Sequence, residues 1–331
     1  MSAALMIEPV DLALRASGLL ALAASILWLF RAHAASTRHL LWTLTFLLLL
    51  TLPAAMLTLP SLEWVAWPFS APIEATSAVH PEATGASLGA VLTMLWLTGT
   101  LVLWLSLAAG WIRFARWART GRPCRDADWI AIVEELRTSL GIRRPIRLIL
   151  SARTTVPMTG GVIFPVVLLP ESADNWPASR RVAVLSHELI HIRRHDALRQ
   201  MLTGLAVAIY WFHPLSWWAA RQAVLSREQA CDEGVLELGA KPSDYASHLF
   251  ALAGYGQAPR LAAMPLIQRS QLERRIQAIL SPDRPSTSWS LASMLCFVLI
   301  LGALTSAVLA PPQGYSCEYK NPLPERLLGS P

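Results

Sequence analysis

The chain has 331 residues, of which 54% are hydrophobic and 15% are charged, and its mean hydropathy is +0.42. A composition this apolar excludes an ordinary soluble globular protein and indicates an integral-membrane protein. The formal net charge of +6 does not indicate a nucleic-acid-binding protein, because the arginines cluster beside apolar runs, where membrane topology accounts for them.

Three apolar runs in the first third of the chain are each long enough to cross a bilayer as a helix. We expect membrane spans at about residues 12–30, 40–59 and 88–112, so that residues 1–112 form a domain of three transmembrane helices. A further apolar run near the C-terminus predicts a fourth transmembrane helix at 288–310.

The basic residues indicate how these spans are oriented. Arginines cluster between the first two spans, directly after the third span and directly before the fourth. All of these clusters lie on one side of the membrane if the N-terminus is outside, and Lys and Arg prefer cytoplasmic loops. We therefore expect residues 113–287 to form a cytoplasmic domain. The N-terminus and a short C-terminal tail, 311–331, are expected outside.

The cytoplasmic part begins with an amphipathic pattern that predicts a helix over about 127–140. Two short apolar runs, 146–150 and 162–169, predict strands that follow this helix. Two further helices are predicted near the end of the domain, over 243–255 and 270–280. This mixture of helices and strands indicates an α+β domain.

The second predicted strand, 162–169, contains Pro165. Proline cannot donate a hydrogen bond to a neighbouring strand, which confines this strand to an edge or a bulge of its sheet. An edge strand can pair with an extended peptide. We therefore expect the residues before the proline to contact a peptide substrate, namely Val162, Ile163 and Phe164.

The segment Val182–Asp196 contains H-E-L-I-H at residues 187–191, an H-E-x-x-H pattern. On an α-helix His187 and His191 project from one face, a turn apart, which suits two ligands of one tetrahedral zinc ion. Glu188 lies one step round the helix, where its carboxylate can reach a water molecule at the metal. An accidental match to this pattern occurs in roughly one chain in a hundred of this length, so a third ligand is needed to support it.

A third ligand must come from elsewhere in the chain. His195 lies about 12 Å from His187 along a straight helix, too far to share one ion, and is expected at a solvated helix end. Glu228 and Asp232 are four residues apart and share a helix face, so Glu228 can complete a two-histidine, one-glutamate site while Asp232 orients a ligand imidazole. The alternative is a solvated acidic helix face. Cys231 between them is expected to be a small packed residue.

The apolar run at 201–220 is not expected to be a further span. A crossing there would place Glu228 and His187 on opposite sides of the membrane, and the site could not close. We expect instead a buried or membrane-embedded helix over 197–212, with His213 in the turn that follows it. The nearby tryptophans are expected at the bilayer interface, which indoles prefer: Trp211, Trp217 and Trp218.

Three segments together resemble a known family: H-E-L-I-H-I-R-R-H-D at 187–196, W-F-H-P-L-S-W-W at 211–218, and R-E-Q-A-C-D-E at 227–233. They are similar to the BlaR/MecR-type integral-membrane zinc metallopeptidases, over about residues 10–310 in layout. These are bacterial antirepressors. The resemblance implies a gluzincin-like protease domain between transmembrane helices in the bacterial inner membrane.

The resemblance also implies roles for individual residues. The implied ligands of a Zn²⁺ ion are the two histidines of the H-E-x-x-H pattern and Glu228, with Glu188 as the catalytic base. Asp232 is implied to support a ligand from behind, and Asp196 matches the pattern with its role left open. By resemblance, the substrate is a cytoplasmic DNA-binding repressor, and self-cleavage within 265–287 is a further expectation.

Full-length members of that family carry a large extracytoplasmic penicillin-binding sensor domain after the last span. Only residues 311–331 follow the last expected span here, so we expect a short form that lacks this sensor. A signal would then enter through the loop at 60–87, the spans or a partner. Homodimerisation is left open by the sequence.

Other functions are weighed against this interpretation. A housekeeping membrane metalloendopeptidase of the heat-shock or CAAX-processing kind usually has its third ligand much further along the chain than Glu228 is from His191. A non-catalytic membrane signal transducer with a structural zinc ion is disfavoured by Glu188, because a structural site needs no base. A small-molecule transporter is the weakest alternative, since the spans lack interior charges apart from Arg15 near an end.

Overall fold

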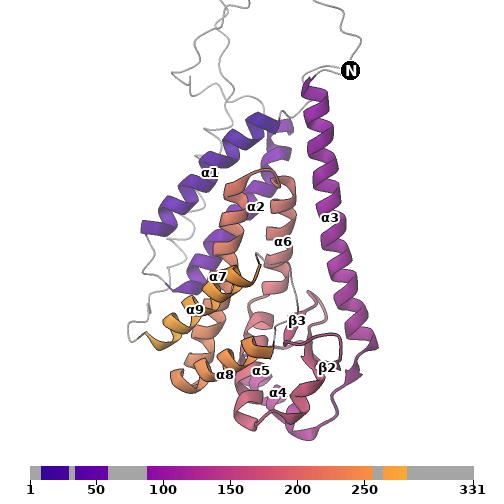
Figure 1. Ribbon diagram of the computed structural model, residues 1–331, viewed down its shortest axis with the longest axis vertical. Helices are drawn as coiled ribbons and strands as arrows, with labels where there is room; N and C mark the ends of the chain where they lie inside the picture. The colour runs from indigo at the N-terminus through magenta and orange to yellow at the C-terminus, as the bar shows by residue number, and fades with distance from the viewer. Residues whose placement is uncertain (1–8, 30–33, 59–87, 256–263, 282–331) are drawn as a thin grey trace, which may run out of the picture.

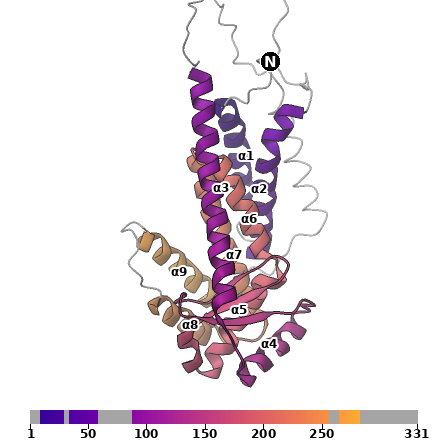
Figure 2. The same ribbon diagram turned by 90° about the vertical axis from the view of Figure 1, so that its right-hand side faces the viewer.

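The computed structural model describes residues 9–29, 34–58, 88–255 and 264–281. The molecule is elongated, with long helices along most of its length and a small sheet with shorter helices at one end (Figures 1 and 2). We call that end the sheet end and the opposite end the distal end. The fourth expected span and the C-terminal tail lie outside the described residues.

Three long apolar helices form the elongated part: α1 (Pro9–Leu29), α2 (Ala35–Thr58) and α3 (Leu88–Thr120). Within the described residues, these are the helices long and apolar enough to cross a membrane. A helix satisfies all of its own backbone hydrogen bonds, which a lipid environment requires. α3 continues eight residues past its expected end at 112, because the arginine-rich sequence that follows has high helix propensity.

The sheet has four strands in the order β1-β2-β4-β3: β1 (Arg122–Pro123), β2 (Arg147–Ser151), β3 (Met158–Gly160) and β4 (Val166–Pro170). β2 and β4 are parallel and pair Ile149 with Leu168, whereas β1 and β3 run antiparallel to their neighbours. All five residues of β4 are buried.

The prediction of an edge strand over 162–169 is wrong, both in where the strand begins and in its place in the sheet. Strand β4 begins only after Pro165, and it is an interior strand with β2 on one side and β3 on the other. Proline lacks a backbone N–H, so Pro165 and Pro170 lie at the two ends of the interior ladder, and Pro165 contributes only its carbonyl, which accepts from the Arg147 N–H at 3.2 Å. The edge next to the site is the short strand β3, which lies beside the helix that carries the H-E-x-x-H pattern.

Helices surround this sheet and share its core. They are α4 (Ala127–Ser139), the short η2 (Glu171–Asn175), α5 (Ala178–Arg193), α8 (Pro242–Tyr255) and α9 (Met264–Leu280). Trp129 of α4 is fully buried and its ring lies 6.3 Å from that of Trp176. The Arg181 guanidinium lies 5.1 Å from the centre of the Trp129 ring. Apolar residues of α4, α5 and the sheet thus form one core.

Replacing Trp129 with alanine is expected to lower the free energy of unfolding by about 3–5 kcal/mol, because it empties a large volume in a core that cannot fully collapse. Thermal unfolding of the detergent-solubilised protein measures the effect. Ile130, its neighbour, is 47% exposed, so Ile130→Ala serves as the matched control and is expected to change stability little. Equal losses in the two variants would contradict the assignment of this core.

Helices α6 (Asp196–Ile209) and α7 (Pro214–Glu237) form a hairpin that rises between α2 and α3 (Figures 1 and 2). At its tip, the Tyr210 hydroxyl donates to the Leu49 carbonyl at 2.9 Å, and the Trp96 indole N–H donates to the Ile209 carbonyl at 2.7 Å. Leu49 and Trp96 lie nine and eight residues, or about 12–14 Å, from the distal ends of their helices. The hairpin therefore enters more than halfway along the candidate spans and returns.

This return keeps Glu228 at the same end as His187, as expected. Two of the tryptophans contact the candidate spans away from the ends of those helices. Trp211 packs against α3 at Gly99, where an added Cβ would lie only 2.5–2.7 Å from its ring. Trp218 makes an edge contact with Trp42 at 5.8 Å, within the length of α2. Trp217 and Trp218 are 43% and 42% exposed, and their place at the bilayer interface stays a prediction.

Candidate metal centre

Helix α5 places two imidazoles side by side. Its residues from Ala183 to Ile190 are all buried, and this apolar packing fixes the helix on the sheet. The rings of His187 and His191 are 4.8 Å apart and nearly perpendicular, and their Nε2 atoms are separated by 3.2 Å. The helical spacing of four therefore produces the paired donors that the sequence indicated.

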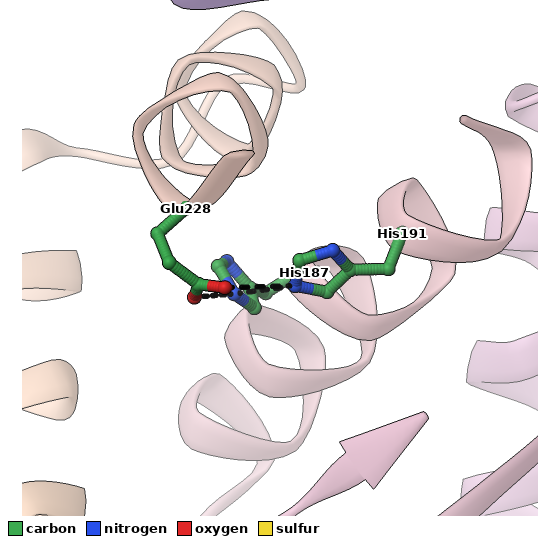
Figure 3. Close-up of side chains that lie close together, drawn as sticks. All are labelled: His187, His191 and Glu228. Atoms are coloured by element: carbon green, nitrogen blue, oxygen red, sulfur yellow. Dashed lines mark hydrogen bonds and ion pairs between the residues drawn. The ribbon is translucent and has the colours of Figure 1, made fainter. Parts of the chain in front are cut away.

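Glu228 of α7 faces this pair (Figure 3). Its Oε2 lies 3.5 Å from the His187 Nε2, and its Oε1 lies 3.9 Å from the His191 Nε2. Donors bound at about 2.0–2.2 Å in a tetrahedron lie about 3.4 Å from one another. The observed separations of the donors, 3.2–3.9 Å, match that spacing, so these three side chains fit a zinc ion without rearrangement.

Asp196 holds the second histidine from behind. Helix α5 ends at Arg193, and His195 adopts a left-handed conformation with φ of 56°, which starts α6 at Asp196. The His191 Nδ1 lies 2.8 Å from the Asp196 Oδ2, so the ring donates there and directs its Nε2 toward Glu228. Burial acts to raise the pKa of Asp196, but the His191 hydrogen bond and the Arg194 guanidinium outweigh it and lower that pKa to about 2.

Asp232 and Tyr245 hold the first histidine. The Tyr245 hydroxyl donates to the Asp232 Oδ1 at 2.7 Å and accepts from the His187 Nδ1 at 2.9 Å. Asp232 itself lies 3.3 Å from that Nδ1 and accepts two hydrogen bonds from Arg275, each 2.8 Å long. Burial acts to raise the pKa of Asp232, but Arg275 and His187 outweigh burial and lower that pKa to about 2.

Two arginines fix the Glu228 carboxylate. Arg227 donates to its Oε1 at 2.8 and 3.0 Å, and Arg275 lies 3.2 Å from its Oε2. Burial acts to raise the pKa of Glu228, but Arg227, the His187 hydrogen bond and Arg275 outweigh burial and hold that pKa well below its usual range. The third donor is therefore an ionised carboxylate at neutral pH.

A second group of donors lies behind the first: His191, Asp196 and Cys231. Its Asp196 carboxylate is already engaged by His191, with Arg194 and Arg199 within 3.6 Å. Burial raises the pKa of the Cys231 thiol well above its usual range. Because the Asp196 carboxylate is already committed to His191 and to the arginines, this group suits a hydrogen-bonded support rather than a metal site. Cys231 is fully buried, as its place in the pattern indicated.

Measurements of zinc affinity in two variants test which of these two groups of donors binds the metal. Asp196→Ala removes the acceptor of the His191 ring and is expected to weaken zinc binding about 10–100-fold. Cys231→Ala removes the thiol from the second group and is expected to leave the affinity nearly unchanged. Competition with a chromophoric chelator measures both. A large loss on removing the thiol, with little loss on removing Asp196, would contradict this assignment.

Glu188 lies beside the donors, and strand β3 fixes its carboxylate. The side chain is only 8% exposed, and Thr159 of β3 donates its hydroxyl proton to the Glu188 Oε2. Two clefts, of about 370 and 240 Å³, meet at His187, Glu188 and Glu228. The larger cleft is bounded by β3, and the smaller one by α8 and α9. A peptide lying across both clefts would pass directly over the donors.

The three residues expected to contact substrate differ in where they lie. Val162 lines the larger cleft, whereas Ile163 and Phe164 are 70% and 74% exposed. Their role in substrate binding stays a prediction. His195 is exposed and hydrogen-bonds Arg144 at 2.8 Å, so it is not among the donors.

Tyr245 and Arg275 were not found by sequence reasoning. Each lies on a helix distant in sequence from the H-E-x-x-H pattern, and neither belongs to a spaced motif. His213 is the N-cap residue that precedes α7, and its Nε2 lies 2.8 Å from the Ser17 hydroxyl of α1, far from the donors.

Comparisons with known proteins point in one direction. The model of a family described as the BlaR1 peptidase M56 family matches residues 20–279, well over half of the chain. The chain is also 26% identical over 218 residues to the regulatory protein BlaR1 of Bacillus licheniformis. That match covers 63% of this chain and 36% of the relative, so the chain spans about a third of the length of the curated relative that it matches.

Proposed function

This chain belongs to the BlaR1 peptidase M56 family, and from that membership and the site geometry we propose that it is an integral-membrane zinc endopeptidase in a signalling pathway. The proposed substrate is a cytoplasmic DNA-binding repressor. The observation that supports catalysis most directly is the position of Glu188, an acid that lines the larger cleft beside the three grouped metal donors.

The donor set suits zinc, which binds imidazole nitrogen and carboxylate oxygen in a tetrahedron and keeps one position open in catalytic sites. His187, His191 and Glu228 would hold it, with Asp196, Asp232 and Tyr245 behind them. When bound, zinc supplies Lewis acidity that polarises a peptide carbonyl and lowers the pKa of water toward neutrality.

Glu188 performs the proton transfers. Its carboxylate takes a proton from the attacking water molecule and returns it to the leaving amine. The Thr159 hydroxyl donates to one oxygen of that carboxylate, which leaves the other oxygen as the proton acceptor. Because Thr159 belongs to β3, the base is fixed relative to the strand edge along which an extended peptide can pair.

A role in regulation is supported by the similarity to BlaR1 of Bacillus licheniformis, a regulatory protein. The three apolar helices support a position in the membrane. We propose the bacterial inner membrane, with both termini outside and residues 113–287 cytoplasmic, so that the site faces a cytoplasmic substrate. Self-cleavage within 265–287 and homodimerisation stay predictions.

Incubation of the purified, zinc-loaded protein with candidate cytoplasmic DNA-binding repressors from the same organism tests this function. The expected result is repressor cleavage at one position by the parent protein and none by Glu188→Gln. Cleavage that persists in Glu188→Gln would point to a contaminating protease. An intact repressor, with zinc bound by both proteins, would favour the non-catalytic transducer instead.

A further inference from the structure

A buried histidine on the second candidate membrane helix has all of its side-chain partners outside its own helix. His39 of α2 is only 4% exposed. Its Nδ1 lies 2.9 Å from the Arg194 Nη2 and 3.5 Å from the Arg199 Nη1. Guanidinium nitrogens only donate, so the His39 Nδ1 is an acceptor and the ring carries its proton on Nε2.

Arg194 connects this histidine to the metal site. Its Nη2 donates to His39, and its Nε lies 3.4 Å from the Asp196 Oδ2. The same oxygen accepts the hydrogen bond from the His191 Nδ1. The His39 Nδ1 is also 3.7 Å from the other Asp196 oxygen. A continuous series of polar contacts thus runs from α2 to a metal donor.

The first turn of α2 also contacts the helix that supplies the third donor. The Ala35 backbone N–H lies 3.1–3.2 Å from the Glu233 carboxylate oxygens, and Arg38 donates to the Gln229 Oε1 at 3.0 Å. Gln229 directly follows Glu228 in α7. α2 and α7 lie side by side along much of their length (Figure 1).

The sheet end of α2 therefore touches both parts of the chain that carry metal donors. One is the junction of α5 and α6, behind His191, and the other is the turn of α7 that carries Glu228. Apolar side chains alone would suffice to pack a helix here, and burying a histidine against two arginines costs desolvation. The polar contacts instead give α2 a defined position relative to the donors.

We propose that His39 is a positioning residue for the metal centre, through which the second membrane helix fixes Arg194, Asp196 and hence His191. The inference rests on the metal site of the proposed function, but not on peptide cleavage. It follows that a displacement of α2, from whatever source, weakens metal binding at the site.

Zinc affinity of the full-length protein in detergent tests this proposal, measured by competition with a chromophoric chelator. His39→Leu, which keeps an apolar side chain in the buried position, is expected to weaken zinc binding at least about tenfold. His39→Asn can accept the Arg194 hydrogen bond through its amide oxygen, and is expected to restore the affinity to within about threefold of the parent. With zinc saturating, kcat in His39→Leu is expected to fall while KM stays unchanged.

Phe46→Leu is the matched control. Phe46 is fully buried in the same helix and packs against Trp42, away from the donors. This variant is expected to lower thermal stability without changing zinc affinity. The proposal is overturned if His39→Leu binds zinc as tightly as the parent, if His39→Asn fails to rescue it, or if Phe46→Leu weakens binding equally. If the parent protein cleaves no peptide but His39→Leu still weakens zinc binding, the proposed function is rejected and the role of His39 is not.

Discussion

Glu188→Gln is expected to lower kcat for peptide hydrolysis by about 10²–10⁴-fold, because glutamine cannot accept the proton of the attacking water molecule. The substitution keeps the shape of the side chain, and its amide oxygen can still accept the Thr159 hydroxyl proton. None of the three metal donors is altered. Zinc content and stability are therefore expected to match those of the parent, and only the chemical step is lost.

Single-turnover cleavage of the substrate, with zinc content measured on the same samples, checks this result. Glu135→Gln is the matched control, since Glu135 is an exposed acid on α4. Its activity is expected to equal that of the parent. Full activity in Glu188→Gln would show that another group serves as the base. Loss of zinc from that variant would show that Glu188 is a ligand instead.

Glu228→Gln is expected to have the second largest effect, a loss of zinc affinity greater than about 100-fold. Removing a partner behind a ligand typically costs 10–100-fold, and removing the anionic ligand itself costs more. Glutamine keeps the volume but not the charge that faces Arg227 and Arg275. Two buried cations then lose a counter-charge, so a modest loss of thermal stability is expected as well.

Chelator competition and metal analysis after dialysis measure this loss. Glu237→Gln provides the control, because Glu237 is an exposed acid on the same helix. The control is expected to retain zinc at the level of the parent. If Glu228→Gln retained zinc with the affinity of the parent, the third ligand would have to be another group, and Asp196 would be the first to examine.

The sequence was most informative where a local pattern determines geometry. The apolar runs are long enough to require helices, and the spacing of four places His187 and His191 together whatever surrounds them. Glu228 could be chosen because Asp232 shares its face and the intervening chain must return to the same side. These inferences depend on run length and helical periodicity, and the choice of Glu228 depends also on the requirement that the site closes on one side of the membrane.

The rest depends on tertiary packing. Tyr245 and Arg275 reach the site from α8 and α9, and no local spacing marks either residue. Pro165 indicates an edge strand from sequence alone, whereas strand β4 starts after it and is interior. The depth of the α6–α7 hairpin could not be predicted, because its apolar surface is equally compatible with a protein core and with the membrane helices that it contacts.

The central claim is that three side chains from α5 and α7 bind one metal ion. A crystal structure of the zinc-loaded protein, with anomalous diffraction recorded at the zinc absorption edge, tests it most directly. We predict one strong anomalous peak about 2.0–2.2 Å from the Nε2 of His187, the Nε2 of His191 and a carboxylate oxygen of Glu228. A peak between Asp196 and Cys231, or zinc bound with Glu228 outside coordination distance, would contradict it.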